Sequence, residues 1–166
     1  MLIILGGLPA VGKTTISRKL AERIGAVYLR IDTIENEIPD SLNIGETGYL
    51  IAYALAKDNL LIGHSVIADS VNPITITRDS WREVAQSTGK EFVEIEIICS
   101  DKDEHQKRVE TRVTDIEGLV LPKWEDVLNR EYHPWEVHGI RIDTAKHSPD
   151  QCVNEIINIL AERLPI

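Results

Sequence analysis

The chain has 166 residues, 43% hydrophobic and 27% charged, a composition typical of a protein that folds around an apolar core. Its formal net charge of −9 argues against general affinity for nucleic acid, because such binding depends on neutralising phosphates. No apolar run approaches the roughly 20 residues that cross a membrane, and no signal peptide is predicted, so we expect a cytoplasmic protein. Cys99 and Cys152 show no metal-ligand spacing and are expected to be reduced thiols.

Apolar periodicity and Gly or Pro stops predict strands that alternate with helices. In chain order, the predicted elements are a strand over 2–5, a helix over 13–24, a strand over 27–31, a short helix over 33–38, a helix over 45–61, a strand over 66–68, a helix over 77–87, a strand over 92–99, a helix from about 101 to 113, a helix over 124–132, a strand over 141–143 and a helix over 149–164. This order predicts one α/β domain over 1–166, a three-layer sandwich around a mainly parallel five-stranded sheet.

The most specific motif lies between the first predicted strand and the first predicted helix. Gly7-Leu8-Pro9-Ala10-Val11-Gly12-Lys13-Thr14, followed by Thr15, matches the phosphate-binding pattern G-x-x-x-x-G-K-[ST]. The glycines let backbone N–H groups turn toward phosphate oxygens, and the helix N-terminus adds partial positive charge. We expect Lys13 to reach the β- and γ-phosphates and Thr14 to ligate Mg²⁺, so the predicted cofactors are ATP and Mg²⁺.

Two carboxylates follow predicted strands, Asp32 after the second and Asp69 after the third. In a parallel sheet both lie at the carboxyl edge, where ligands bind. A carboxylate there can accept a hydroxyl proton during phosphoryl transfer. The alternatives are that Asp32 only caps the next helix and that Asp69 only forms a turn.

A lid is predicted over about 108–132. Arg108 and Arg112 are four residues apart, so both are expected on one helix face, ahead of an irregular segment over 114–123. A mobile segment of this kind brings arginines onto a nucleotide and excludes water. The alternative is a solvated charged face, and Trp124 and Trp135 are expected to pack rather than to bind a base.

These segments resemble the small P-loop kinases, with their P-loop NTPase sandwich. More narrowly, the chain resembles the predicted ATP-binding kinases that include the kinase domain of polynucleotide kinases, with chloramphenicol phosphotransferase and zeta toxin as more distant relatives. The resemblance is carried by residues 6–15, 28–32 and 66–73, with Arg78 and Trp81.

The resemblance implies roles for four residues. Asp32 matches the general base, and Asp69 matches the acidic residue that holds Mg²⁺ or orients the acceptor site. Arg112 matches the arginine on the transferring phosphate, and Arg108 the one against the adenine or the phosphates. Asn72 and Arg78 are weaker candidates, because Arg78 is equally compatible with a plain surface position.

One position departs from the pattern of polynucleotide kinases. They carry an arginine three residues after the general base, whereas this chain has Glu35, with Asn36 and Glu37 beside it. A carboxylate repels an acceptor phosphate. The sequence therefore predicts a kinase, monomeric or homodimeric, that phosphorylates a hydroxyl of a small molecule. The alternatives are a polynucleotide 5′-hydroxyl kinase, a toxin-like kinase and a nucleotide-binding regulatory module with little catalysis.

Overall fold

The computed structural model describes residues 1–39, 45–135 and 139–163. Within these ranges the elements are β1 (Leu2–Gly6), α1 (Lys13–Ile24), β2 (Val27–Arg30), α2 (Ile31–Asn36), α3 (Thr47–Leu61), β3 (Val66–Asp69), α4 (Thr75–Ser87), β4 (Phe92–Ile98), α5 (Lys102–Thr111), α6 (Trp124–Leu128), β5 (Ile140–Asp143) and α7 (Pro149–Arg163). The α/β alternation expected from the sequence is confirmed.

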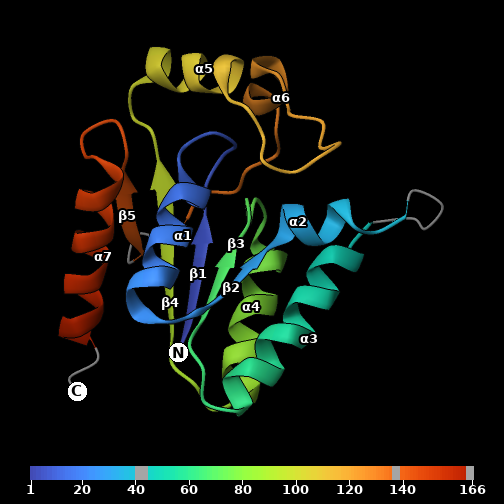
Figure 1. Cartoon of the computed structure of the whole chain (residues 1–166), viewed down its shortest axis with the longest axis vertical. Helices are drawn as coiled ribbons and strands as arrows, with labels where there is room; N and C mark the ends of the chain where they lie inside the picture. Colours follow the sequence, from blue (N-terminus) through green and yellow to red (C-terminus); the bar gives the residue numbers. More distant parts are fainter. Residues whose placement is uncertain (40–44, 136–138, 164–166) are drawn as a thin grey trace.

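The five strands form one sheet in the order β2-β3-β1-β4-β5, and all four strand pairings are parallel. From β1 the chain crosses to the edge strand β2, and only after β3 does it cross to the other side of β1. The loop after β1 therefore lies where the direction of winding reverses, which is the usual ligand position in such sheets. Figure 1 shows α5 and α6 beyond this carboxyl edge.

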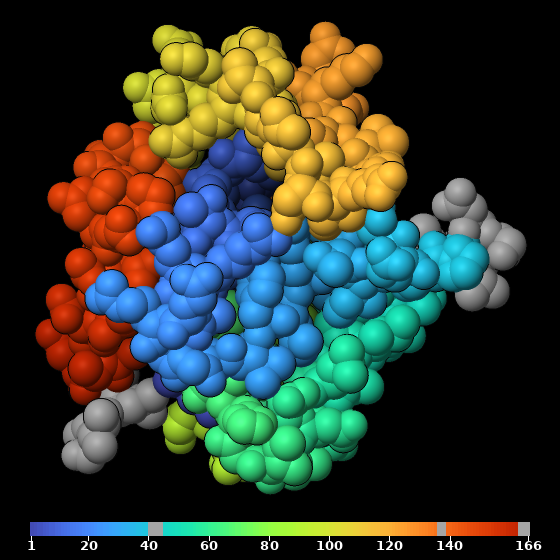
Figure 2. Space-filling view, viewed as in Figure 1, coloured from blue at the N-terminus to red at the C-terminus, as the bar shows by residue number. Residues whose placement is uncertain are grey.

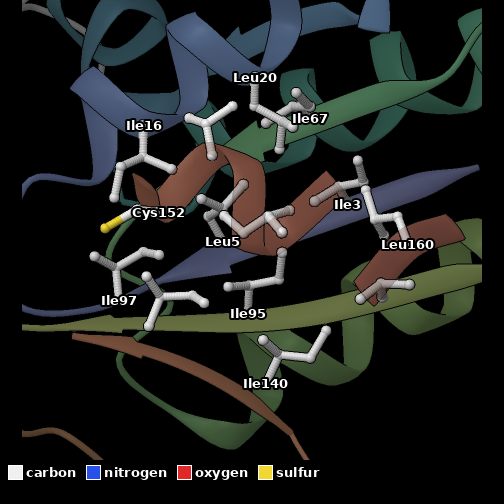
Figure 3. Close-up of a cluster of buried hydrophobic side chains, with 14 of the residues drawn as sticks. Ile3, Leu5, Ile16, Leu20, Ile67, Ile95, Ile97, Ile140, Cys152 and Leu160 are labelled. Carbon is white, nitrogen blue, oxygen red and sulfur yellow. The ribbon is translucent and has the colours of Figure 1, made fainter. Parts of the chain in front are cut away.

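The core lies on both faces of the sheet. In β1, Leu2 and Ile4 face the cluster formed with α3 and α4, while Ile3 and Leu5 face the cluster formed with α1 and α7. Figure 3 shows the second cluster, where Cys152 of α7 lies among the isoleucines of the sheet. Because both faces are covered, β1 is buried along its whole length and holds the loop after it in a fixed position.

Several predicted helix boundaries differ from the structure. The helix expected to reach Val113 ends at Thr111, because Arg112 has extended backbone (ψ 146°) and the β-branched Val113 and Thr114 follow. The helix expected over 124–132 ends at Leu128. In α3 the side chain of Leu50 is 59% exposed, whereas Ala52, Ala56 and Leu60 are buried.

Two further features concern the cysteines and the length of the helices. Both cysteines are free thiols. Within the described residues, every helix is too short or too polar to cross a membrane.

Candidate active site

The loop between β1 and α1 has a backbone that requires glycine. Gly7 and Gly12 have φ of 143° and 102°, and Ala10 also lies in the left-handed region with φ of 64°. A Cβ on Gly7 would approach the carbonyl oxygen of Ile97 in β4 to 2.2 Å. The backbone N–H of Gly7 donates to the carbonyl of Val71 at 3.1 Å. Contacts from the strands on both sides therefore fix the loop.

Lys13 points into this loop and is only 8% exposed. Its Nζ donates to the carbonyl oxygen of Leu8 at 2.8 Å. Burial lowers the pKa of Lys13 to about 8, although Asp69 and Asp32 act in the opposite direction. The amine therefore lies in a preformed cradle, where a bound phosphate would stabilise its charged form.

Asp69, at the end of β3, is 3% exposed. The Tyr28 hydroxyl donates to its Oδ2 at 2.7 Å, and the Thr14 hydroxyl also interacts with this carboxylate. Burial raises the pKa of Asp69, and Lys13 opposes the shift. A hydroxyl beside a carboxylate is an oxygen-donor set that suits Mg²⁺, which usually takes one or two protein ligands plus phosphates and water. The described residues contain no cluster of three or more His, Cys, Asp or Glu that could hold a metal without such help.

Asp32 lies in the first turn of α2, and it does not cap the helix. The N-cap residue is Arg30, and no side-chain cap hydrogen bond is formed. The Asp32 side chain is 51% exposed, lies 3.9 Å from Arg30 Nη2 and faces the cavity that contains Lys13. The capping alternative is therefore wrong, and the carboxylate is available to a ligand.

A cavity of about 1050 Å³ brings these groups together. Figure 2 shows it as a hollow between the dark blue loop after β1 and the yellow to orange segment that contains α5 and α6. Predicted site residues that line it are Pro9, Ala10, Gly12, Lys13, Thr14, Thr15, Asp32, Asp69, Arg108 and Arg112. Gly7, Leu8 and Val11 lie outside the lining, and they support the loop from behind.

Arg108 lies within α5 and Arg112 is the residue that ends it, with its backbone N–H donating to the Arg108 carbonyl at 3.1 Å, and both side chains line the cavity as expected. Arg108 donates to Glu104 at 3.0 Å and to the Thr144 hydroxyl at 2.8 Å. The Nε of Arg112 is buried and has no hydrogen-bond partner among the described residues, and burial lowers its pKa while Asp32 opposes the shift. Arg112 is therefore the arginine with donor capacity left for a ligand.

Sequence reasoning missed the loop after β5. The Thr144 hydroxyl donates to the carbonyl of Val11 at 2.8 Å, so this loop supports the phosphate-binding loop. Thr144, His147 and Pro149 also line the cavity beside Arg108. No local motif marks these residues. Their position after the carboxyl end of a parallel strand is the signal that would have found them.

The irregular segment after α5 is tied across the mouth of the cavity. Asp115 forms ion pairs with Arg18 of α1 and with Arg30 of β2, the latter at 2.9 Å. Hydrogen bonds from Arg30 and Arg18 lower the pKa of the Asp115 carboxyl. His105 of α5 donates through Nε2 to the carbonyl of Pro9 at 2.8 Å, which connects α5 directly to the phosphate-binding loop.

Other candidates have packing roles. Arg78 is 3% exposed rather than on the surface, and its guanidinium donates to the carbonyls of His133 and Pro134 while lying 4.4 Å from the Trp135 ring centroid. Asn72 donates to the Leu5 carbonyl at 2.7 Å, which holds the end of β1. None of these side chains lines the cavity in the described residues.

Trp124 and Trp135 also pack, as expected. The Trp124 ring meets His105 edge-on at 5.1 Å. Trp135 covers Gly6, where an added Cβ would lie 2.0 Å from the indole.

The sheet order, the phosphate-binding loop and the flanking helices define the P-loop kinase fold. The chain belongs to the AAA_33 family, described as an AAA domain, whose model matches residues 2–129. A Pyrococcus furiosus protein described as "Putative adenylate kinase" is 26% identical over 170 residues, covering 96% of this chain and 84% of that protein.

Solved structures share this fold. One, reported as a "putative kinase" from Chloroflexus aurantiacus, superposes with a TM-score of 0.76 at 24% identity, covering 97% of this chain and 96% of the other. The structure of the APS kinase of Mycobacterium tuberculosis in complex with AMPPNP and APS superposes with a TM-score of 0.71 at 17% identity, covering 96% of each chain. The narrower likeness to polynucleotide kinases stays a prediction.

Proposed function

We propose that this protein is an ATP- and Mg²⁺-dependent kinase that transfers the γ-phosphoryl group to a hydroxyl of a small molecule. The observation that carries the proposal is that Lys13 and Asp32 face one cavity and interact electrostatically across it. The AMPPNP reported in the similar APS kinase structure supports ATP as the phosphoryl donor.

The nucleotide phosphates lie in the loop after β1, where backbone N–H groups and Lys13 bind them. The base lies between Arg108 and the loop after β5, which line the same end of the cavity. Thr14 and Asp69 would hold Mg²⁺, which would supply neutralisation of the negative charge on the phosphates. Arg112, whose Nε has no protein partner, donates to the transferring group.

The acceptor binds on the Asp32 side of the cavity. Its hydroxyl oxygen attacks the γ-phosphorus, and the bond from that phosphorus to the β–γ bridging oxygen breaks, so ADP leaves. The hydroxyl proton passes to the Asp32 carboxylate. The products are ADP and a phosphate monoester. Residues 108–132 act as the lid that excludes water during this step.

A second candidate follows from the name of the archaeal relatives, which implies transfer to the phosphate of AMP. The two reactions give different products, because a nucleotide acceptor yields a phosphoanhydride and an alcohol yields a monoester.

The test is an ATP-consumption screen over sugars, amino sugars, nucleosides, AMP and oligonucleotides, with products identified by ³¹P NMR. The proposal predicts a phosphate monoester formed in equal amount to ADP, and none with Lys13→Ala. If AMP alone is converted, to ADP, the protein is an adenylate kinase. Tight ATP binding with only slow hydrolysis would make it a regulatory module.

A further inference from the structure

The acceptor side of the cavity is acidic. It is built by α2, α3 and the residues after β3, and residues 31–39 and 45–65 contain five carboxylates, one lysine and no arginine. Two of these carboxylates, Asp32 and Glu35, line the cavity. Since kinases that bind phosphorylated acceptors need cations to hold the anionic group, this composition disfavours such acceptors.

Glu35 is built into the cavity wall. It is half-buried, and a Cβ on Gly48 of α3 would lie 2.3 Å from its Cγ and 2.9 Å from its Oε1. The Glu35 side chain therefore packs against the backbone of α3 at Gly48, and a side chain at position 48 would displace it from this place at the cavity.

The protein does not neutralise this carboxylate. Within the described ranges the Glu35 side chain has no hydrogen bond or ion pair, and its pKa is raised first by burial and then by Asp32, with no opposing cation. Of the arginines that line the cavity, Arg18 and Arg30 pair with Asp115, and none contributes to the pKa shift of Glu35. A half-buried, uncompensated carboxylate in a ligand cavity is a site for a cation that the ligand brings.

A second observation also indicates a polar ligand. Ser70, directly after β3, lines the same cavity and is 4% exposed, yet in the described part of the chain its Oγ forms no close hydrogen bond, only a weaker interaction with the Tyr49 phenol. Buried hydroxyls normally have a partner. The phenol of Tyr49 lies beside Ser70. The wall opposite the phosphates thus presents a carboxylate and two hydroxyls.

We infer that the acceptor is a hydroxylated amine, such as an amino sugar or an aminocyclitol, whose ammonium group binds Glu35 while a hydroxyl faces Asp32. This inference rests on the proposed function. Further polar groups of the acceptor bind Ser70 and Tyr49. The amine is a binding group and is not phosphorylated. It leaves the cavity unchanged while the hydroxyl oxygen takes the phosphoryl group.

The test compares matched acceptors that differ in charge. Initial rates with Mg-ATP are measured for glucosamine, glucose and gluconate, and for an aminocyclitol against myo-inositol. We expect kcat/KM to be at least about tenfold higher for each amine than for its neutral match, and lowest for the acid, a difference equivalent to one favourable charge contact.

Glu35→Gln keeps the size of the side chain and removes the charge. It should raise KM for the amine about tenfold more than KM for the neutral acceptor, so that the preference for the amine is lost, and leave the KM for ATP unchanged. The matched control is Glu37→Gln, because Glu37 is exposed and does not line the cavity. The Glu37→Gln variant should keep the preference for the amine over the neutral acceptor. Melting temperatures of both variants establish that they are folded.

The outcomes separate the inference from the function on which it rests. A preference for neutral or anionic acceptors, or an amine preference that survives Glu35→Gln, would overturn the inference and leave the kinase proposal standing. If no acceptor of any charge forms a phosphate ester, the proposed function itself is contradicted.

Discussion

Lys13 combines burial with charge, and this combination gives it a measurable signature. The amine is almost inaccessible and has one loop carbonyl as hydrogen-bond partner. Since a buried ammonium is costly, its pKa falls to about 8 even with Asp69 and Asp32 nearby. A bound triphosphate would place negative charge beside the amine and so raise the pKa of Lys13.

We therefore predict that affinity for Mg-ATP falls as pH rises above about 8. Below that pH the free protein already carries the charged amine. Above it, binding must take up a proton, so Kd rises by up to tenfold per pH unit. Isothermal titration between pH 7.5 and 9.5 measures this. Lys13→Arg, which stays charged, should show no such dependence, and a constant wild-type Kd would contradict the assignment.

Asp32→Asn tests the proposed general base. The amide has a similar size and cannot accept a proton, so we expect acceptor phosphorylation to fall by about 10²–10⁴-fold while ATP affinity is retained. Rates with the best acceptor from the screen and a parallel ATP titration measure the two effects. Undiminished turnover would mean that Asp32 has no part in the proton transfer.

The roles of Lys13 and Thr14 stay predictions, but the loop conformation that positions them was predictable from the sequence, because the motif encodes it. The freedom of Arg112 and the burial of Arg78 were not, because they depend on which distant carbonyls and carboxylates each guanidinium meets. Glu35 was recognised as unusual, but its place in the cavity wall depends on Gly48 of another helix.

The segment between α5 and α6 is the element whose position is set by few contacts. Asp115 joins it to α1 and β2 through ion pairs that are about half exposed on the carboxylate side. Exposed ion pairs contribute roughly 0.2–1 kcal/mol each. Contacts of this size are weak enough to permit the opening that the proposed lid requires for substrate entry.

Asp115→Asn should therefore loosen this segment without unfolding the protein. We expect proteolytic cleavage within residues 113–123 to accelerate up to about fivefold, with little change in melting temperature. Glu117→Gln is the control, since its side chain is exposed on the same segment. Equal cleavage rates for wild type and Asp115→Asn would show that these ion pairs do not hold the segment.

Element boundaries were predictable where the chain carries a stop signal. The first helix begins and ends as expected, because Gly25 terminates it with φ of 65°. The end of α5 has no such glycine, so the sequence pattern predicted a helix that continues past Thr111, where the helix in the structure ends. The strand order β2-β3-β1-β4-β5 was not predicted, because it results from packing between distant segments.

At the scale of the whole molecule, the sheet and its two apolar clusters form a rigid base for the cavity. β1 is fully buried between α1 and α7 on one face and α3 and α4 on the other. Ligand binding should therefore stabilise the folded state by mass action without needing a new core to form. Binding at the cavity should therefore be measurable as a change in the unfolding temperature of the whole protein.

The most direct test of the account is the stabilisation of the ligand-free protein by Mg-ATP, measured by thermal unfolding of wild type and Lys13→Ala. Without ligand both should melt at nearly the same temperature, because Lys13 points into the cradle and not into the core. At a ligand concentration of about 100 times Kd, wild type should gain roughly 2.7 kcal/mol and the variant far less. Equal stabilisation of the two proteins would contradict the nucleotide site and everything built on it.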